Sequence, residues 1–183
     1  MLSEQAKTSF DAIFKQSLTK NLSGQCTIET ITDTVNLSEN EFVLLTIVAP
    51  VFKFLTLFYI NTDESVKSFF LSEVDSEKRD VNDVNNDQFR DSYLEFVNVF
   101  CGVMNQYLLK YFNYLGTSTP YILKRECATD LSLLNPGYLR HFKVTVNDSI
   151  IFHITLSVFD FADLDFKASF DEIEHTSGEL ELF

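Results

Sequence analysis

Apolar residues recur along the chain with two different periods, and each period predicts a kind of element. In residues 4–20 they fall every three or four positions, the spacing of one helix face; they are Ala6, Phe10, Ile13, Phe14 and Leu18. Residues 26–35 alternate between apolar and polar side chains instead, which predicts a half-buried strand. Residues 42–48 and 51–60 are apolar runs on either side of Ala49-Pro50, which predicts a hairpin of two buried strands.

The span from Phe42 to Ile60 is also long enough to cross a membrane as a helix. Pro50 interrupts it near the middle, Lys53 places a charge in it, and its β-branched and aromatic side chains favour strands. The start of the chain, MLSEQAK, has no basic region followed by an apolar stretch, so we expect no secretory signal. These observations predict a soluble, cytoplasmic protein.

The remaining segments alternate between helix and strand patterns. The pattern predicts helices over 64–74 and 89–115, a polar surface loop over 75–88, a turn over 135–137, and strands over 121–127, 141–146 and 150–159. Asn147-Asp148 joins the last two strands as a two-residue hairpin loop. Gly116 is the expected end of the longest helix.

The order of these elements is α-β-β-β-α followed by α-β-β-β. It predicts an α+β fold with two pseudo-symmetric halves, an extra helix between them, and long helices packed on the sheet. A chain of 183 residues fits one domain, which we place at 1–160, followed by an acidic C-terminal extension at 161–183. Within that extension, residues 162–183 allow either a short amphipathic helix or a frayed tail.

Charge and composition restrict the classes of molecule that could bind this chain. The net charge of −13 argues against nucleic acid and membrane surfaces, because both carry negative charge. The three Cys and three His are scattered and match no metal-binding or disulfide spacing, so we expect reduced thiols and no metal bound by this chain.

The longest predicted helix carries one narrow polar stripe with spacings of 4, 3, 4 and 3. Its members are Asp91, Glu95, Asn98, Gly102 and Asn105. A solvated face of an amphipathic helix is the common explanation of such a stripe. Two details favour a functional one: it contains no Lys or Arg, and Gly102 costs about 1 kcal/mol relative to Ala in a helix interior. A helix accepts that cost where a partner approaches its backbone closely.

The same residues resemble a known signature. Asp91-x3-Glu95-x2-Asn98-x21-Pro120 is similar to the D/S-x3-E-x2-N-x21-P pattern of the CheC/CheX/FliY phosphatases, and Gly102 with the STPYIL run resembles the CheX members most. Residues 4–20 contain no E-x2-N, so one site per chain is implied, as in CheX. The chain departs from the family at the Ala49-Pro50 turn, where Gly is frequent, and in the acidic extension.

The resemblance implies a hydrolase of chemotaxis-type two-component signalling, which removes the aspartyl phosphate of a CheY-like response-regulator receiver domain. It implies that Asn98 orients the attacking water and Glu95 pairs with the receiver's Lys. Asp91, Gly102 and Asn105 would contact the receiver. Pro120 would open a strand, and Mg²⁺ would belong to the receiver, with no cofactor bound by this chain. A CheX-like protein would also form a homodimer.

Two other functions stay open. One is a non-catalytic module of the same fold that binds a receiver domain or a flagellar switch component, because a fold alone does not settle activity. The other is an unrelated enzyme, which the sequence disfavours because it shows no phosphate-binding Gly loop, Ser/His/Asp set or metal cluster.

Overall fold

The computed structural model of the chain describes residues 1–32, 39–74, 86–128 and 134–170. Its helices are α1 (Glu4–Asn21), α2 (Glu64–Val74), α3 (Asn86–Leu108) and a 3₁₀ helix, η1 (Arg125–Ala128). Its strands are β1 (Cys26–Ile31), β2 (Glu41–Val48), β3 (Phe52–Tyr59), β4 (Gly116–Thr117), β5 (Tyr121–Lys124), β6 (Tyr138–Val146) and β7 (Ile150–Asp160).

The strands form one antiparallel sheet whose order is symmetric about its centre. β3 pairs with β7, β2 flanks β3 and β6 flanks β7, and each half then exchanges its outer strand with the other: β1 pairs with β6, and β5 pairs with β2. The two-residue β4 also pairs with β2. This order confirms the predicted α+β fold with two pseudo-symmetric halves, and α2 is the extra helix between them.

Both predicted hairpins are confirmed. β2 and β3 pair from Phe42 opposite Tyr59 to Val48 opposite Lys53, so the long apolar span folds back on itself. Asn147 and Asp148 have φ of 50° and 57°, the left-handed conformation of a two-residue turn that matches the twist of the β6–β7 pair. Among the described residues, no helix combines the length and the apolar character needed to cross a bilayer.

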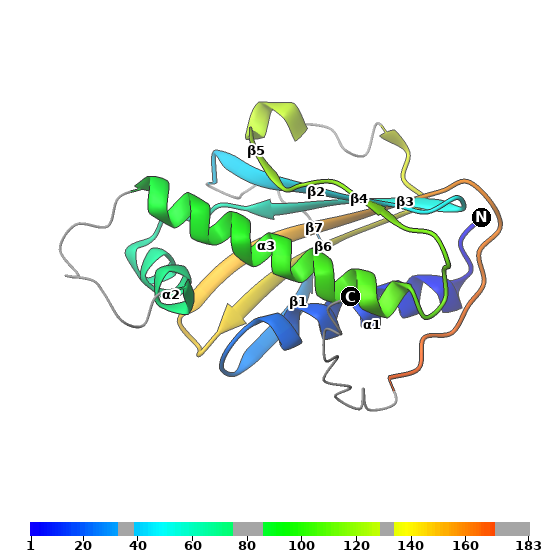
Figure 1. The fold of residues 1–183 in the computed structure, drawn as a ribbon, viewed down its shortest axis with the longest axis horizontal. Coiled ribbons are helices and arrows are strands. Elements are labelled where there is room, and N and C mark those ends of the chain that lie inside the picture. The colour runs from blue at the N-terminus through cyan, green and yellow to red at the C-terminus, as the bar shows by residue number, and fades with distance from the viewer. Residues whose placement is uncertain (33–38, 75–85, 129–133, 171–183) are drawn as a thin grey trace, which may run out of the picture.

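The α-helices cover one face of the sheet (Figure 1). Most of the buried aromatic residues meet on that face. Phe14 of α1 lies 5.4 Å from Phe100 of α3, measured between ring centroids, and 4.8 Å from Phe142 of β6. Phe70 of α2 lies 4.7 Å from Tyr93 of α3. A smaller cluster of Phe42, Leu57 and Tyr59 forms on the opposite face. The helices are therefore held rigidly by large side chains, while their outer surfaces stay available.

Helix α3 is displaced relative to the prediction at both ends. It begins at Asn86 rather than Phe89. Its first turn is polar and has no apolar stripe from which a helix could be predicted. It ends at Leu108 rather than at Leu115, where the carbonyl of Leu108 accepts from the amides of both Tyr111 and Phe112 in a tightened turn. Tertiary packing ends the helix here, because Phe112 turns inward to lie 4.7 Å from the ring of Phe52.

Strand boundaries in the second half also differ. The strand predicted over 121–127 ends at Lys124 and continues as η1. β6 begins at Tyr138 rather than at His141, because Arg140 interrupts the apolar alternation by which the strand was predicted. The predicted strand over 26–35 is half-buried as expected through Ile31, and its residues 33–35 lie outside the described part, as does 75–85 of the predicted loop.

The described part of the C-terminal extension forms no helix and is not frayed. Residues 161–170 lie along α1, with Leu2 and Leu164 in a β-bridge and both buried. Ser9 of α1 donates to the carbonyl of Phe166 and accepts from the amide of Ala168. The sequence prediction failed because the apolar residues of this segment pack individually onto α1 and the end of α3, without helical periodicity.

Candidate functional site

The polar stripe of α3 lies on the outside of the molecule. Asp91, Glu95, Asn98 and Gly102 are exposed, whereas Asn105 is half-buried. Among the described residues, the side chains of Asp91, Glu95 and Asn98 have no hydrogen-bond or ion-pair partner. The Oδ1 atom of Asn105 is buried and accepts no hydrogen bond from the part of the chain that the structure describes. The stripe is thus presented to solvent along three turns and recedes into the protein at Asn105.

Gly102 leaves open space beside the stripe. A Cβ atom added at this position would meet nothing within 4 Å. Packing inside the chain therefore does not require a glycine here, although glycine destabilises a helix interior by about 1 kcal/mol relative to alanine. The free space lies one turn after Asn98, where an approaching surface would meet the helix backbone.

Several contacts hold α3 in a fixed orientation, so that the stripe faces outward. The buried Tyr93 hydroxyl donates to the carbonyl of Tyr59 at 3.0 Å, and the Asn21 amide donates to the carbonyl of Phe96 at 3.0 Å. Burial, with a smaller contribution from the Glu39 charge, raises the pKa of Tyr93 far above its usual range. The phenol therefore stays protonated and remains a donor at any physiological pH.

Pro120 lies at an irregularity on the edge of the sheet. Thr117 is opposite Ile47 and Tyr121 is opposite Leu44, so three residues of one strand oppose two of β2, as in a β-bulge. Ser118 bridges the irregularity, because its hydroxyl accepts from the amide of Thr46 at 3.0 Å. A proline lacks the amide donor of a regular ladder, and an edge bulge is where sheets tolerate it. Pro120 directly precedes β5, as the sequence predicted.

A groove that sequence reasoning missed opens beside Glu95. It has a volume of about 290 Å³ and is lined by Asn21, Leu22, Phe69, Phe70, Ser92, Glu95, Phe96 and Val99, from the three α-helices. Val99 is 45% exposed and is the large apolar side chain of α3 that faces solvent. The one sign of this groove in the sequence was the apolar Val99 directly after Asn98. The wall from α2 was unpredictable, because the approach of α2 to α3 is a tertiary feature.

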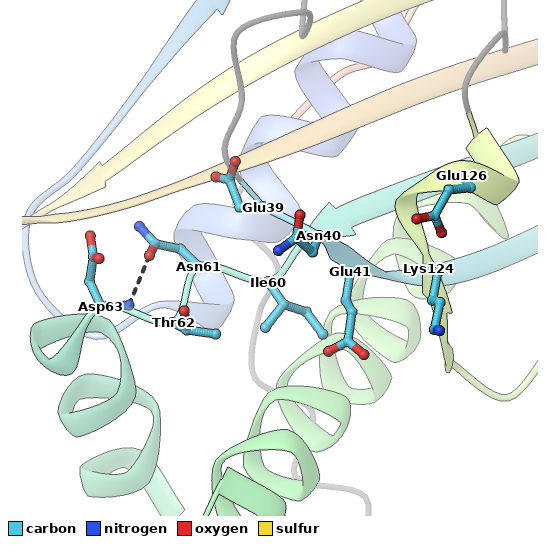
Figure 2. A pocket seen from close by; sticks show the side chains of 9 residues that line it. All are labelled: Glu39, Asn40, Glu41, Ile60, Asn61, Thr62, Asp63, Lys124 and Glu126. Atoms are coloured by element: carbon cyan, nitrogen blue, oxygen red, sulfur yellow. Dashed lines mark hydrogen bonds between the residues drawn. The ribbon is translucent and has the colours of Figure 1, made fainter.

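A second, more polar hollow of about 440 Å³ lies where β2 begins and β3 and β5 end (Figure 2). Four carboxylates line it, those of Glu39, Glu41, Asp63 and Glu126, and the figure shows that they do not converge on one point. Among the residues that the structure describes, no group of three or more His, Cys, Asp or Glu side chains could hold a metal ion. The hollow therefore has no geometry of a cation site.

Glu39 also ties this hollow to the sheet. Its Oε1 atom lies 2.9 Å from Nδ1 of His153 on β7, and its side chain is buried. Burial by itself would raise the pKa of Glu39, but the hydrogen bonds with His153 and with its own backbone bring the pKa below its ordinary value. The pair acts as a structural link between β7 and the residues just before β2.

The α3 stripe offers a carboxylate and a primary amide one helical turn apart, both free of partners within the described chain. A carboxylate can pair with a cation, and an amide can both donate to and accept from a water molecule. Neither group is a nucleophile held beside a general base. The arrangement suits the positioning of a group supplied by a partner molecule.

Comparison with solved structures finds the same fold. A chemotactic CheC-like protein from Shewanella oneidensis is 16% identical, with a TM-score of 0.56 over 82% of this chain and 95% of that one. CheX from Borrelia burgdorferi, solved in a complex with CheY, BeF3 and Mg²⁺, is 15% identical, with a TM-score of 0.53 over 84% and 97%. FliY from Thermotoga maritima is 11% identical, with a TM-score of 0.51 over 88% and 92%. No protein-family model and no curated protein matches the sequence.

Proposed function

Because the chain has the fold of CheC-like, CheX and FliY structures, we propose that it is a phosphatase for the aspartyl phosphate of a CheY-like receiver domain. The observation that carries the proposal is the pairing of Glu95 and Asn98 on the exposed stripe of α3, with open space at Gly102. The fold supports a helix that docks on a partner, and the residues on that helix support the reaction.

The proposed reaction is a hydrolysis by water. The water oxygen forms a bond to phosphorus, the bond between phosphorus and the aspartyl oxygen breaks, and the carboxylate leaves with the electron pair. The products are the free aspartate and inorganic phosphate, and one water proton passes to phosphate or solvent. A carboxylate is a stable leaving group, so the step needs no general acid from this chain.

Asn98 is the residue that would position the water. Phosphoryl transfer depends mainly on placing the nucleophile in line with the breaking bond and on neutralising charge on the phosphoryl oxygens. The amide of Asn98 is exposed and unpaired, so it is able to accept from the water and donate to a neighbouring oxygen. Charge neutralisation would come from Mg²⁺ and a Lys of the receiver.

Glu95 would set the register of docking. It lies one turn before Asn98 on the same face, where a salt bridge to the receiver's Lys would fix the position of the amide above the phosphoryl group. Asp91 would contribute at the edge of the contact, and the space at Gly102 would admit a loop of the receiver. Asn105 would contribute least, because it is half-buried.

The test is phosphate release from a panel of phosphorylated receiver domains, with wild type, Asn98→Ala and Glu95→Lys. We expect wild type to accelerate release from at least one receiver, Asn98→Ala to bind that receiver without accelerating release, and Glu95→Lys to lose binding through like-charge repulsion. If wild type binds a receiver but leaves its rate of phosphate loss unchanged, the chain is instead a non-catalytic interaction module. If it binds none of the panel, the receiver is not its partner.

A further inference from the structure

The groove beside Glu95 is continuous with the stripe, because Glu95 belongs to both. Phe69 from α2 and Phe96 from α3 form apolar walls, and the exposed Val99 stands at its mouth directly after Asn98. Its volume of about 290 Å³ is just under the lower end of small-molecule pockets, which begin at about 300 Å³. The size suits a single side chain presented by another protein.

The charge of the groove further restricts the kind of protein that could bind there. Among the residues that the structure describes, Glu95 is the one charged residue that lines the groove, and no Lys, Arg or His lines it. The occupant that complements both features is an apolar side chain that lies next to a cation. A nucleic acid or an anionic membrane surface would bring negative charge to the carboxylate, on a chain whose net charge is already −13.

A second copy of this chain is also a poor occupant. A two-fold interface centred on the groove would bring the same patch of both copies together. Glu95 and the nearby Asp91 of one copy would then face Glu95 and Asp91 of the other, and like charges across an interface are destabilising. The charge pattern therefore favours a different protein with a basic surface.

We infer that this groove receives an apolar side chain of the receiver domain, located beside the Lys that pairs with Glu95. The inference rests on the proposed function and extends it, because it assigns Phe69 and Val99 to partner recognition. Neither residue would touch the reacting atoms. The salt bridge would supply orientation, and the apolar contact would hold the complex together for long enough to react.

The test compares three variants of the full chain. Val99→Ser and Phe69→Ala change the groove, and Leu109→Ser is the matched control, because Leu109 is 46% exposed and does not line the groove. The probe is a receiver domain from the panel, complexed with BeF3 and Mg²⁺ to imitate the phosphorylated form. We expect the Kd to rise about tenfold for each groove variant, the loss of one buried apolar contact, and to stay within about twofold for Leu109→Ser.

Phosphate release separates this inference from the proposed function. The groove variants should need about tenfold more phosphorylated receiver to reach half-maximal phosphate release, whereas Asn98→Ala should release phosphate slowly at every receiver concentration and Leu109→Ser should match wild type. If the groove variants bind as wild type does while Asn98→Ala abolishes catalysis, the groove inference is wrong and the phosphatase stands. If the groove variants lose self-association in sedimentation and keep receiver affinity, the groove is a contact between copies. If wild type binds no receiver, both proposals are wrong.

Discussion

Helices α1 and α3 begin the two halves of the fold, and each buries a Phe ring, Phe14 and Phe100, on the same face of the sheet. Their outer surfaces differ. α1 carries Lys7 in an ion pair with Glu4 at 2.7 Å, and Lys15 lies 5.7 Å from the ring centroid of Phe142. Its charged side chains are therefore engaged within the chain.

The surface of α1 is also partly covered. The segment 161–170 runs along it, and Ser9 is only 5% exposed because the backbone of that segment binds its hydroxyl. On α3 the corresponding polar groups, Glu95 and Asn98, are exposed and unpaired within the described residues. Pseudo-symmetry thus reproduces the packing of the two helices but not their outer surfaces, since buried contacts maintain the fold in both, whereas the polar groups of the α3 stripe stay exposed.

The largest expected effect tests the shared role of the two helices. Phe14→Ala and Phe100→Ala should each lower the free energy of unfolding by about 3–5 kcal/mol, because each removes a fully buried ring and leaves a cavity. The double variant should lose less than the sum, since the two rings are in contact. Urea unfolding measures all three. If only one of the two single variants lost stability, the two helices would not be equivalent in holding the fold together.

The next largest expected effect tests whether the outer surfaces of α1 and α3 differ in function. Asn98→Ala should lower the rate of phosphate release by about 100-fold or more, because positioning of the water acts in the transition state. Gln16→Ala removes an exposed amide from α1 and should leave the rate unchanged. Both variants should change stability by under about 1 kcal/mol. Equal rates for Asn98→Ala and Gln16→Ala would show that α3 has no special role in catalysis.

A smaller effect concerns the segment that covers α1. Leu164→Ala should destabilise the protein by about 2 kcal/mol, since Leu164 is buried against Leu2 and the start of α1. Phosphate release per folded molecule should not change, because the segment lies on α1 and not on the stripe. Thermal unfolding and the release assay on the same samples test this. If Leu164→Ala released phosphate more slowly under conditions where all of the protein is folded, the segment would help to position the α3 stripe.

The smallest effect concerns Gly102. Gly102→Ala should raise the free energy of unfolding by a few tenths of a kcal/mol to about 1 kcal/mol, because the added Cβ has room and alanine favours the helix. Gly102→Phe should keep the fold and weaken receiver binding by filling the space beside the stripe. If Gly102→Phe unfolds the protein, the space is needed by the chain itself and the docking surface lies elsewhere.

Much of the fold follows from local patterns. The continuous apolar runs around Ala49-Pro50 predicted the β2–β3 hairpin, and Asn147-Asp148 predicted the β6–β7 turn, because turn geometry depends on neighbouring residues. The 4-3-4 spacing placed Asp91, Glu95, Asn98 and Gly102 on one face, since helical periodicity alone determines which residues share a face. Boundaries were less accurate where tertiary packing ends an element, as at Leu108.

The sequence by itself determined the candidate pair Glu95 and Asn98, because a helix aligns residues three apart wherever it lies in the fold. Only the tertiary structure decided what surrounds that pair. The exchange of β1 and β5 between halves, the approach of Phe69 to Val99, and the coverage of α1 by residues 161–170 all join segments far apart in the chain. Such contacts depend on the packing of whole elements, which no local period records, and they give two equivalent helices different surfaces.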